Sequence, residues 1–297
     1  MRRASVILLL AAALLGGCAQ ATPTPMLTEP ETAAPSVIEQ QAAPEPTAEH
    51  ALAGRITVAG STTVQPLAEK LAAAFRAANP EVEIVIQGGG SSVGVKSAAQ
   101  GIVDIGTASR EVKDSEKAEY PDLVIHRIAV DGVAIIVHPD VPLDSITTEQ
   151  VQAVFAGEIA NWRELGGPDQ PITVVAREEG SGTRDFFQEH FMKDKEIVAR
   201  AILQPSNGAL RTAVSTTPNS IGFLSFGYLD DSVKALAVDG VQPTEANVYA
   251  GTYTAWRYLN MLTRGEPAGL ARAWLEFILS DDGQQIVTAQ GYLAVKR

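Results

Sequence analysis

Three short turns rich in glycine and hydroxyl residues recur in this chain, each between a β-branched run and an apolar-patterned helix. They are AGSTTV at 59–64, GGGSSVGV at 88–95 and EGSGTRDF at 179–186. Alternation of short strands with helices is typical of an α/β fold with a mostly parallel sheet and helices on both faces. In such sheets, the strand ends that precede the helices form the edge where ligands bind.

The spacing of apolar residues predicts where the individual strands and helices lie. Strands are expected at 56–59, 83–86, 103–106, 172–175, 221–224 and 253–262, and a longer β run at 125–137 is expected to be interrupted by Asp131 and Gly132. Helices are expected at 64–78, 93–100, 147–156, after Gly182, around 210–215, and at 268–279 and 282–289. No internal repeat is evident, and these units are compatible with one sheet or with two lobes.

The chemistry of the three turns favours an anionic ligand. The first turn of a helix has unpaired N–H groups and the positive end of the helix dipole. Glycine allows the backbone to approach a ligand closely, and serine or threonine hydroxyls add donors. Arg177 ends the strand before the third turn, and its guanidinium can bind an oxyanion through two N–H groups. Since serine and threonine also cap ordinary helices, the prediction depends on the recurrence of the turns.

Several other site types are excluded by their sequence signatures. The second turn has the glycine spacing of a P-loop, but Val95 occupies the position of the required lysine. Its glycines are also one residue too widely spaced for the dinucleotide-binding fingerprint. The chain has no H-E-x-x-H motif and no cysteine pair, so no metal site is predicted. A serine hydrolase using Ser181 is a distant alternative, because none of the four histidines lies in a catalytic motif.

The N-terminus has the features of a secretory signal at residues 1–18. Two arginines precede an apolar run at 4–15, which is shorter than the ~20 residues that span a bilayer. Cys18, the only cysteine, follows Leu15-Gly16-Gly17 in a pattern that resembles the lipobox of bacterial lipoproteins, and this resemblance implies cleavage and lipidation at Cys18. An ordinary signal peptide with an incidental cysteine is the alternative.

The composition of residues 19–54 predicts a disordered tether, because the segment has six prolines and five glutamates but no lysine or arginine. The formal net charge of the whole chain is −12. A face basic enough for nucleic acid is not apparent, so that class of partner is excluded. Any bound anion must therefore be held by local groups against the overall field of the protein.

Five segments resemble, in the same order, the phosphate-binding proteins of bacterial ABC phosphate importers. They are AGSTTVQPLAEKLAAAF, QGGGSSVGVKSAAQGIVDIGTASRE, VFAGEIANWRELGG, VAREEGSGTRDFF and PNSIGFLSFGYL. The resemblance begins near residue 55 and implies a type II periplasmic-binding-protein fold. In that fold, two α/β lobes joined by a two-segment hinge close on a ligand in the cleft between them. The expected lobes are 55–131 with 252–297, and 134–249.

The resemblance also implies a function. We expect a monomeric, lipid-anchored protein at the outer face of the cytoplasmic membrane or in the periplasm. It would capture inorganic phosphate and deliver it to the permease subunits of an ABC importer, without catalysis and without a cofactor. The same fold binding another tetrahedral oxyanion, such as sulfate, molybdate or tungstate, is the alternative.

Ligands can be carried over from the family by position. They are Thr62, Thr63 (through its backbone), Ser91, Arg177, Ser181, Gly182 and Thr183, with Ser61 as a further possibility. Glu179 stands where the family has an acid that pairs with the arginine. Its position two residues after Arg177 on an extended strand places both side chains on one face.

One position departs from the family pattern. The best-known members have an aspartate after the third strand, which accepts a hydrogen bond from protonated phosphate, whereas this chain has Ser109-Arg110 there. Our hypothesis is that Asp131 provides the acceptor and that Arg110 adds charge. A purely structural role of Asp131 in a hinge turn is equally compatible with the sequence.

Overall fold

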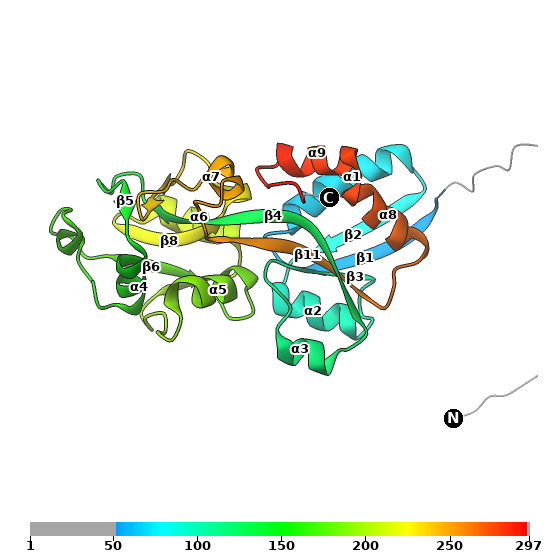
Figure 1. Ribbon diagram of the computed structural model, residues 1–297, viewed down its shortest axis with the longest axis horizontal. Helices are drawn as coiled ribbons and strands as arrows, with labels where there is room; N and C mark the ends of the chain where they lie inside the picture. Colours follow the sequence, from blue (N-terminus) through cyan, green and yellow to red (C-terminus); the bar gives the residue numbers. More distant parts are fainter. Residues whose placement is uncertain (1–51, 296–297) are drawn as a thin grey trace, which may run out of the picture. The chain divides into compact units, whose positions relative to one another are not determined.

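The computed structural model describes residues 52–295. The predicted signal, Cys18 and almost all of the predicted tether lie outside the described residues. The described chain is mixed α/β and has two apolar cores (Figure 1). Lobe 1 has its buried apolar residues within 56–129 and 259–292, and lobe 2 has its own within 133–255, joined by Leu293.

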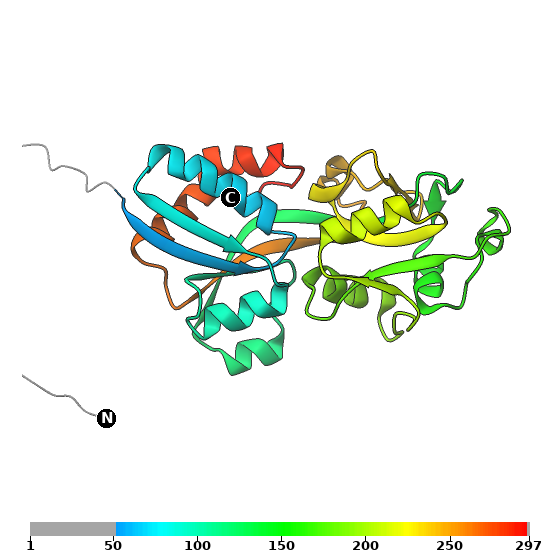
Figure 2. The ribbon, with the colours of Figure 1, turned by 180° about the vertical axis from the view of Figure 1, so that it is seen from behind.

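The elements of lobe 1 come from both ends of the described chain. They are β1 (Gly54–Gly60), α1 (Gln65–Ala78), β2 (Val82–Gln87), α2 (Ser91–Ala99), β3 (Ile105–Ala108), α3 (Asp114–Glu119), α8 (Gly269–Leu279) and α9 (Asp281–Ala289). Two long strands run between the lobes, β4 (Leu123–Val137) and β11 (Trp256–Arg264). Figure 2 shows both strands crossing from one lobe to the other.

The elements of lobe 2 come from the middle of the chain. They are β5 (Ser145–Ile146), α4 (Thr148–Ala156), η1 (Trp162–Leu165), β6 (Thr173–Arg177), α5 (Gly182–Phe187), η2 (Gln188–Met192), β7 (Ile202–Gln204), α6 (Asn207–Thr216), β8 (Ser220–Ser225), η3 (Phe226–Tyr228), β9 (Lys234–Ala235), β10 (Ala237–Val238) and α7 (Glu245–Tyr249).

The main sheet is mixed rather than mostly parallel. Its strand order is β2-β1-β3-β11-β4-β8-β6-β7, and β9 pairs with β4. β1 pairs in parallel with β2 and β3, and β6 pairs in parallel with β7 and β8. The two crossing strands are antiparallel to each other and to their neighbours β3 and β8. Each lobe therefore keeps a parallel unit, whose strand ends can form a ligand-binding edge.

The predicted interruption of the long β run at Asp131 and Gly132 is wrong, because β4 continues through both residues. Asp131 pairs in register with Arg257 of β11, and the two side chains form an ion pair. Opposite charges on paired strands stabilise the pairing, so an acid is compatible with a strand interior here. At Gly132, an added Cβ would clash with the ring of Phe226.

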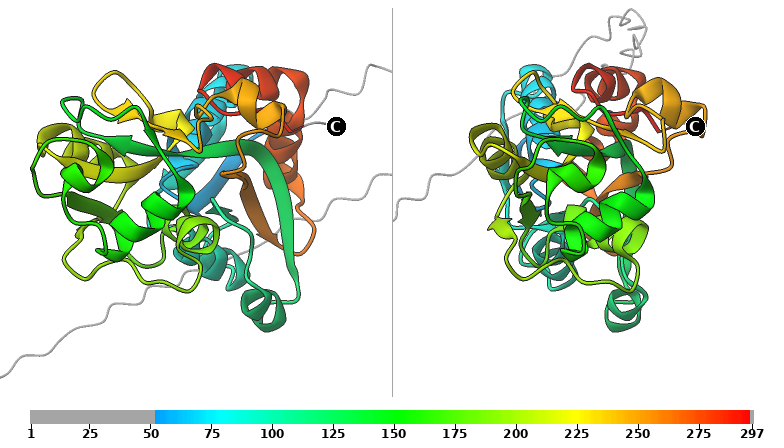
Figure 3. Two further views of the ribbon diagram at one scale, coloured as in Figure 1. Left: turned by 60° about the vertical axis from the view of Figure 1, so that its left-hand side comes forward. Right: turned by 90° about the vertical axis from the view of Figure 1, so that its left-hand side faces the viewer.

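Packing of the helices follows their apolar patterns. α1 has Pro66 in its first turn, where proline is favoured, and buries Leu67, Leu71 and Phe75. Figure 3 shows α1, α8 and α9 on one side of the lobe 1 sheet and α2 and α3 on the other. None of the helices between residues 52 and 295 combines the length and the apolar character needed to span a bilayer.

Close packing of α2 brings the first two glycine-hydroxyl turns together. Gly94 of α2 lies against the backbone of Thr107 and Gly60, where an added Cβ would clash with the Thr107 carbonyl oxygen. The backbone N–H of Gly90 also donates to the carbonyl oxygen of Gly60 at 2.8 Å. A side chain at position 94 would separate the start of α2 from the ends of β1 and β3.

Candidate functional site

The three glycine-hydroxyl turns surround one small cavity between the lobes. In this closed arrangement the space left among its lining residues is too small for a water molecule. The lining residues are Ser61, Thr62, Thr63, Gly90, Ser91, Ser109, Arg177, Ser181, Gly182 and Thr183. All of these residues except Thr62 are buried. The structure therefore brings together the hydroxyls and helix starts of both lobes around one enclosed space.

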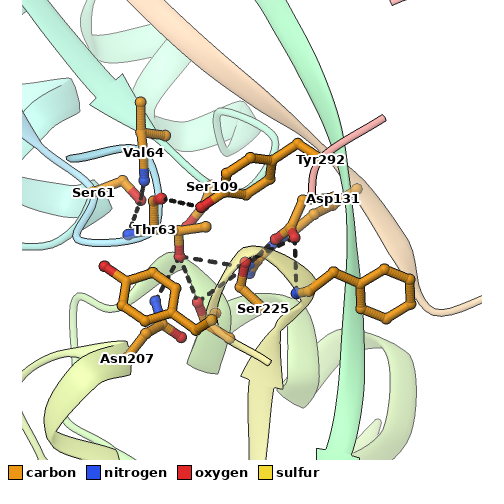
Figure 4. Close-up of polar contacts among 12 residues, drawn as sticks. Ser61, Thr63, Val64, Ser109, Asp131, Asn207, Ser225 and Tyr292 are labelled. Carbon is orange, nitrogen blue, oxygen red and sulfur yellow. Dashed lines mark hydrogen bonds and ion pairs between the residues drawn. The ribbon is translucent and has the colours of Figure 1, made fainter. Parts of the chain in front are cut away.

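The first turn supplies hydroxyls and is held by two tyrosines. Ser61 Oγ accepts hydrogen bonds from the backbone N–H groups of Thr63 at 3.2 Å and Val64 at 3.4 Å, at the start of α1 (Figure 4). The Thr63 N–H, which we expected to contact the ligand, is thus engaged by Ser61. The Tyr228 and Tyr292 hydroxyls donate to the carbonyl oxygens of Thr62 and Thr63 at 2.5 and 2.9 Å.

In the second turn, Ser91, which the sequence predicted as a ligand, contacts Ser109, which the sequence did not predict as one. Ser91 is fully buried, and its Oγ accepts a hydrogen bond from the backbone N–H of Ser109 at 3.0 Å. The two hydroxyl oxygens lie 3.4 Å apart. Ser109 follows β3 and lines the cavity, so the place of the family aspartate is taken here by a hydroxyl group.

The third turn, in lobe 2, is in close contact with lobe 1. Ser181 is the N-cap of α5, and its Oγ accepts from the Arg184 backbone N–H at 3.3 Å. A Cβ on Gly182 would clash with Ser91 Oγ. The Ser92 N–H donates to the Gly180 carbonyl oxygen across the two lobes at 3.2 Å. The structure is therefore a closed one, in which only glycine fits at position 182.

Arg177 is a buried cation without a carboxylate partner among the described residues. It is 2% exposed, and its Nε donates to Gln204 O at 3.1 Å. Its Nη2 donates to Pro205 O at 2.9 Å and, across the lobes, to Thr62 Oγ1 at 3.3 Å. Burial, together with the positive charge of Arg257, lowers the pKa of Arg177 to about 10. Arg177 remains charged at neutral pH, so the cavity has an unbalanced positive charge.

The expected support of Arg177 by Glu179 is not found. Glu179 is exposed, and no ion pair joins it to Arg177 in residues 52–295. The chain turns directly after it, where Gly180 has a φ of 80°. The strand ends at Arg177, so the same-face argument no longer applies two residues later, and carbonyl groups hold the guanidinium instead.

Arg110 does not line the cavity. Its two Nη atoms each donate to a carboxylate oxygen of Glu116 in α3 at 2.8 Å. Its Nε lies 2.7 Å from Asp185 Oδ2 in α5, and Lys113 Nζ lies 3.0 Å from the same oxygen. The charge that we expected to reach the ligand is therefore used in ion pairs, two of which cross between the lobes.

Asp131 is fully buried and lies outside the cavity lining. Its Oδ1 accepts from Ser225 Oγ at 2.7 Å and from the Phe226 N–H at 3.2 Å (Figure 4). Its Oδ2 accepts from Arg257 Nη2 at 2.9 Å and Nε at 3.2 Å. Burial raises the pKa of Asp131, against the opposing effect of Arg257 and the hydrogen bonds. The structure thus places this carboxylate between the crossing strands β4 and β11 and not in the cavity lining.

Two residues that the sequence did not single out contact the hydroxyls of the cavity. Arg257 Nη2 donates to Thr183 Oγ1 at 3.0 Å, and Asn207 Nδ2 donates to Thr63 Oγ1 at 2.7 Å. A single arginine within the apolar strand pattern TAWRYLNML was the available signal for Arg257. Asn207 had no signal, because an asparagine at the start of a helix is ordinary.

Other chemistries have no support among the described residues. Between residues 52 and 295, no group of three His, Cys, Asp or Glu side chains is arranged to hold a metal ion. The side-chain hydrogen bond of Ser181 in this region is its cap to Arg184 N, and no histidine contacts its hydroxyl.

Comparison with known proteins places this geometry in a family. A family model described as a PBP superfamily domain matches residues 41–282. The phosphate-binding protein PstS of Bacillus subtilis is 39% identical over 249 residues, which are 83% of each chain. A structure of a putative phosphate ABC transporter substrate-binding protein from Clostridium perfringens, with bound phosphate, has 40% identity and a TM-score of 0.79 and covers 82% of this chain and 100% of that one. An ABC-type phosphate transport receptor from Vibrio cholerae has 32% identity and a TM-score of 0.69, with 81% and 100% covered.

The mixed sheet, the two lobes and the enclosed cavity define a binding protein of the periplasmic-binding-protein superfamily. Within this superfamily, the chain belongs to the family of phosphate-binding proteins named PstS.

Proposed function

We propose that the protein captures inorganic phosphate outside the cytoplasm and delivers it to the permease subunits of an ABC importer, without catalysing a reaction. The observation that carries the proposal is Arg177, a buried cation whose described partners are neutral oxygens. An anion in the cavity would supply the missing negative charge. The names of the relatives from Bacillus subtilis and Vibrio cholerae support phosphate as that anion.

The lining is suited to replace the water around a phosphate dianion. Removing such an ion from water costs on the order of tens of kcal/mol by Born estimates, so many aligned donors must compensate. We propose as ligands the hydroxyls and backbone N–H groups of both lobes together with the guanidinium. They are Thr62, Thr63, Ser91, Arg177, Ser181, Gly182 and Thr183, with Ser61 and Ser109 beside them. Arg110 and Asp131 we assign to the interface and the hinge.

Phosphate capture would be coupled to closure of the lobes, for which we keep the expected bounds 55–131 with 252–297 and 134–249, except that Tyr253 and Ala255 pack in the core of the second lobe. Only a ligand that binds the closed form better than the open form can shift that equilibrium. Ligands from both lobes meet this condition, because the complete set of donors exists only after closure. The closed form would then be recognised by the permease.

Attachment to a membrane would follow from lipidation at Cys18, with the protein acting as a monomer at the outer face of the cytoplasmic membrane or in the periplasm. The support is the sequence Leu15-Gly16-Gly17-Cys18. Cys18→Ser is expected to release the protein from the membrane fraction of expressing cells. Equal amounts of the wild-type and Cys18→Ser proteins in that fraction would contradict the anchor.

Another tetrahedral oxyanion is the second candidate ligand, and one observation favours keeping it. The cavity lining contains no carboxylate that could accept the proton of phosphate and repel sulfate. Calorimetric titrations with phosphate, sulfate and molybdate separate the candidates. We expect the lowest dissociation constant for phosphate, and preferential binding of sulfate or molybdate would contradict the proposal.

A further inference from the structure

Three buried polar residues lie directly behind the cavity without lining it. Asp131 on β4 and Arg257 on β11 form the ion pair of the hinge strands, and Asn207 begins α6 in lobe 2. Their exposed fractions are 0%, 4% and 0%. Arg257 Nη1 has no hydrogen-bond partner among the described residues. The interior therefore contains N–H donors in addition to those that pair with Asp131, namely Arg257 Nη1 and Asn207 Nδ2.

Asn207 Nδ2 and Arg257 Nη2 converge on two threonines, one from each lobe. Thr63 Oγ1 receives Asn207 Nδ2 at 2.7 Å and Arg257 Nη2 at 3.5 Å. Thr183 Oγ1 receives Arg257 Nη2 at 3.0 Å. The two hydroxyl oxygens lie 3.1 Å from each other.

The hydrogen-bonding capacity of these groups leaves one hydroxyl hydrogen for the cavity. A hydroxyl oxygen has two lone pairs and one hydrogen. The two hydrogens of Arg257 Nη2 go to Asp131 Oδ2 at 2.9 Å and to Thr183 Oγ1 at 3.0 Å, and Asn207 donates to Thr63, so each threonine oxygen accepts from one donor. One of the two hydroxyl hydrogens joins the two oxygens, and the other is left to donate into the cavity that both threonines line.

We propose that Asn207 and Arg257 are positioning residues that each occupy a lone pair of one threonine, so that the Thr63 and Thr183 hydroxyls present one hydrogen between them to the bound anion. This inference rests on the proposed function and deepens it. The corner of the site at these two threonines then selects an anion oxygen without a proton, because two donors facing each other are repulsive. Arg257 acts through the threonines, and its ion pair with Asp131 fixes its own position between β4 and β11.

A double-mutant cycle on phosphate binding tests the inference, because Asn207 is linked to Thr183 through Thr63, and no hydrogen bond joins Asn207 and Thr183 directly within residues 52–295. We expect Thr183→Val to weaken phosphate binding about 10- to 100-fold, the range for a hydrogen bond to a charged group. Asn207→Leu is expected to weaken it about 5- to 10-fold. The double variant should bind about as well as Thr183→Val alone, since Asn207 acts on the pair of hydroxyls and that pair no longer exists without Thr183.

Asn260 provides a matched control, because it is also a fully buried asparagine. Its Nδ2 donates to the Arg110 carbonyl oxygen, away from the threonines. In the cycle of Asn260→Leu with Thr183→Val, the fold-changes should multiply. If the effects of Asn207→Leu and Thr183→Val also multiply, the positioning role is wrong. If the wild-type protein binds no phosphate, the proposed function fails first and this inference with it.

Folding is checked by circular dichroism and thermal unfolding of each variant. If Asn207→Leu does not fold, Arg257→Lys replaces it in the cycle. A lysine keeps the charge beside Asp131 but lacks the planar guanidinium that donates to both Asp131 and Thr183. A non-multiplicative cycle between Arg257→Lys and Thr183→Val is again the expected result, and a multiplicative one overturns the proposal.

Discussion

At the scale of single residues, the chemistry of the site depends on an arginine that the fold leaves without a counter-ion. A buried cation is costly unless it is paired or its surroundings solvate it. Arg177 is held by two carbonyl oxygens and one hydroxyl, and a second buried arginine lies close enough to lower its pKa. A site of this kind is prepared for a negative ligand at some expense of stability in its absence.

We expect Arg177→Met to weaken phosphate binding at least 100-fold, because the buried positive charge and its donors are lost. The free energy of unfolding of the phosphate-free protein should not decrease by more than about 1 kcal/mol, because an unpaired buried charge is removed as well. Calorimetric titration and thermal unfolding without phosphate measure the two effects. Near wild-type affinity in this variant would mean that the ligand lies elsewhere.

The residues of the site could be predicted only in part from the sequence. The Gly-Ser-Gly-Thr turn and the preceding arginine could be recognised, because small residues in a strand–helix turn and an arginine at a strand end have few packing roles. Arg257 and Asn207 could not be recognised, since their positions depend on which strands and helices meet. Glu179 was misplaced because the strand ends two residues before it.

At the scale of elements, glycines determine how closely the two lobes approach. α5 begins against α2 of the other lobe, and Gly182 leaves room for Ser91 Oγ. α5 is also the helix of the strand–turn–helix unit that provides Arg177 and Ser181. The start of α5 can therefore contribute to a site shared by both lobes only if residue 182 leaves room for the opposite lobe.

Gly182→Ala is expected to weaken phosphate binding at least 10-fold, because the added Cβ holds the lobes apart and misplaces Ser91, and a small displacement in a site of directed donors is costly. Its melting temperature should remain close to that of the wild type. Gly208→Ala, in α6 of the same lobe, is the control, because its Cβ has no contact closer than 3.8 Å. Equal affinities for the two variants would contradict the close approach.

Most of the strands and longer helices were predictable from apolar spacing. The predicted strands at 56–59 and 221–224 and the predicted helix at 64–78 correspond to β1, β8 and α1. Several short elements, among them α3, β5 and β7, were missed because so few residues show no periodicity. The central antiparallel pair was missed because strand direction depends on contacts between distant segments.

At the scale of the whole molecule, ion pairs between the lobes accompany the closed arrangement. Asp185 of lobe 2 lies between Arg110 and Lys113 of lobe 1 at 2.7 and 3.0 Å. None of these side chains lines the cavity. Their attraction therefore contributes to the stability of the closed form without a contact to the ligand.

Asp185→Asn should weaken phosphate binding about 5-fold at low salt, the value for an ion pair worth about 1 kcal/mol. The difference from wild type should shrink at high salt, where the attraction is screened. Asp169→Asn is the control, because Asp169 pairs with Arg163 within lobe 2 and is 70% exposed. An effect of Asp185→Asn that is independent of salt would argue against an electrostatic role in closure.

The most direct test of the whole account is a calorimetric titration of the purified protein with phosphate, beside the Arg177→Met variant. The account predicts one phosphate per chain, with a dissociation constant of about 1 μM or below for the wild type. It also predicts loss of that binding in the variant. Absence of binding to the wild type, or equal binding to both proteins, would contradict the claim that this cavity captures phosphate.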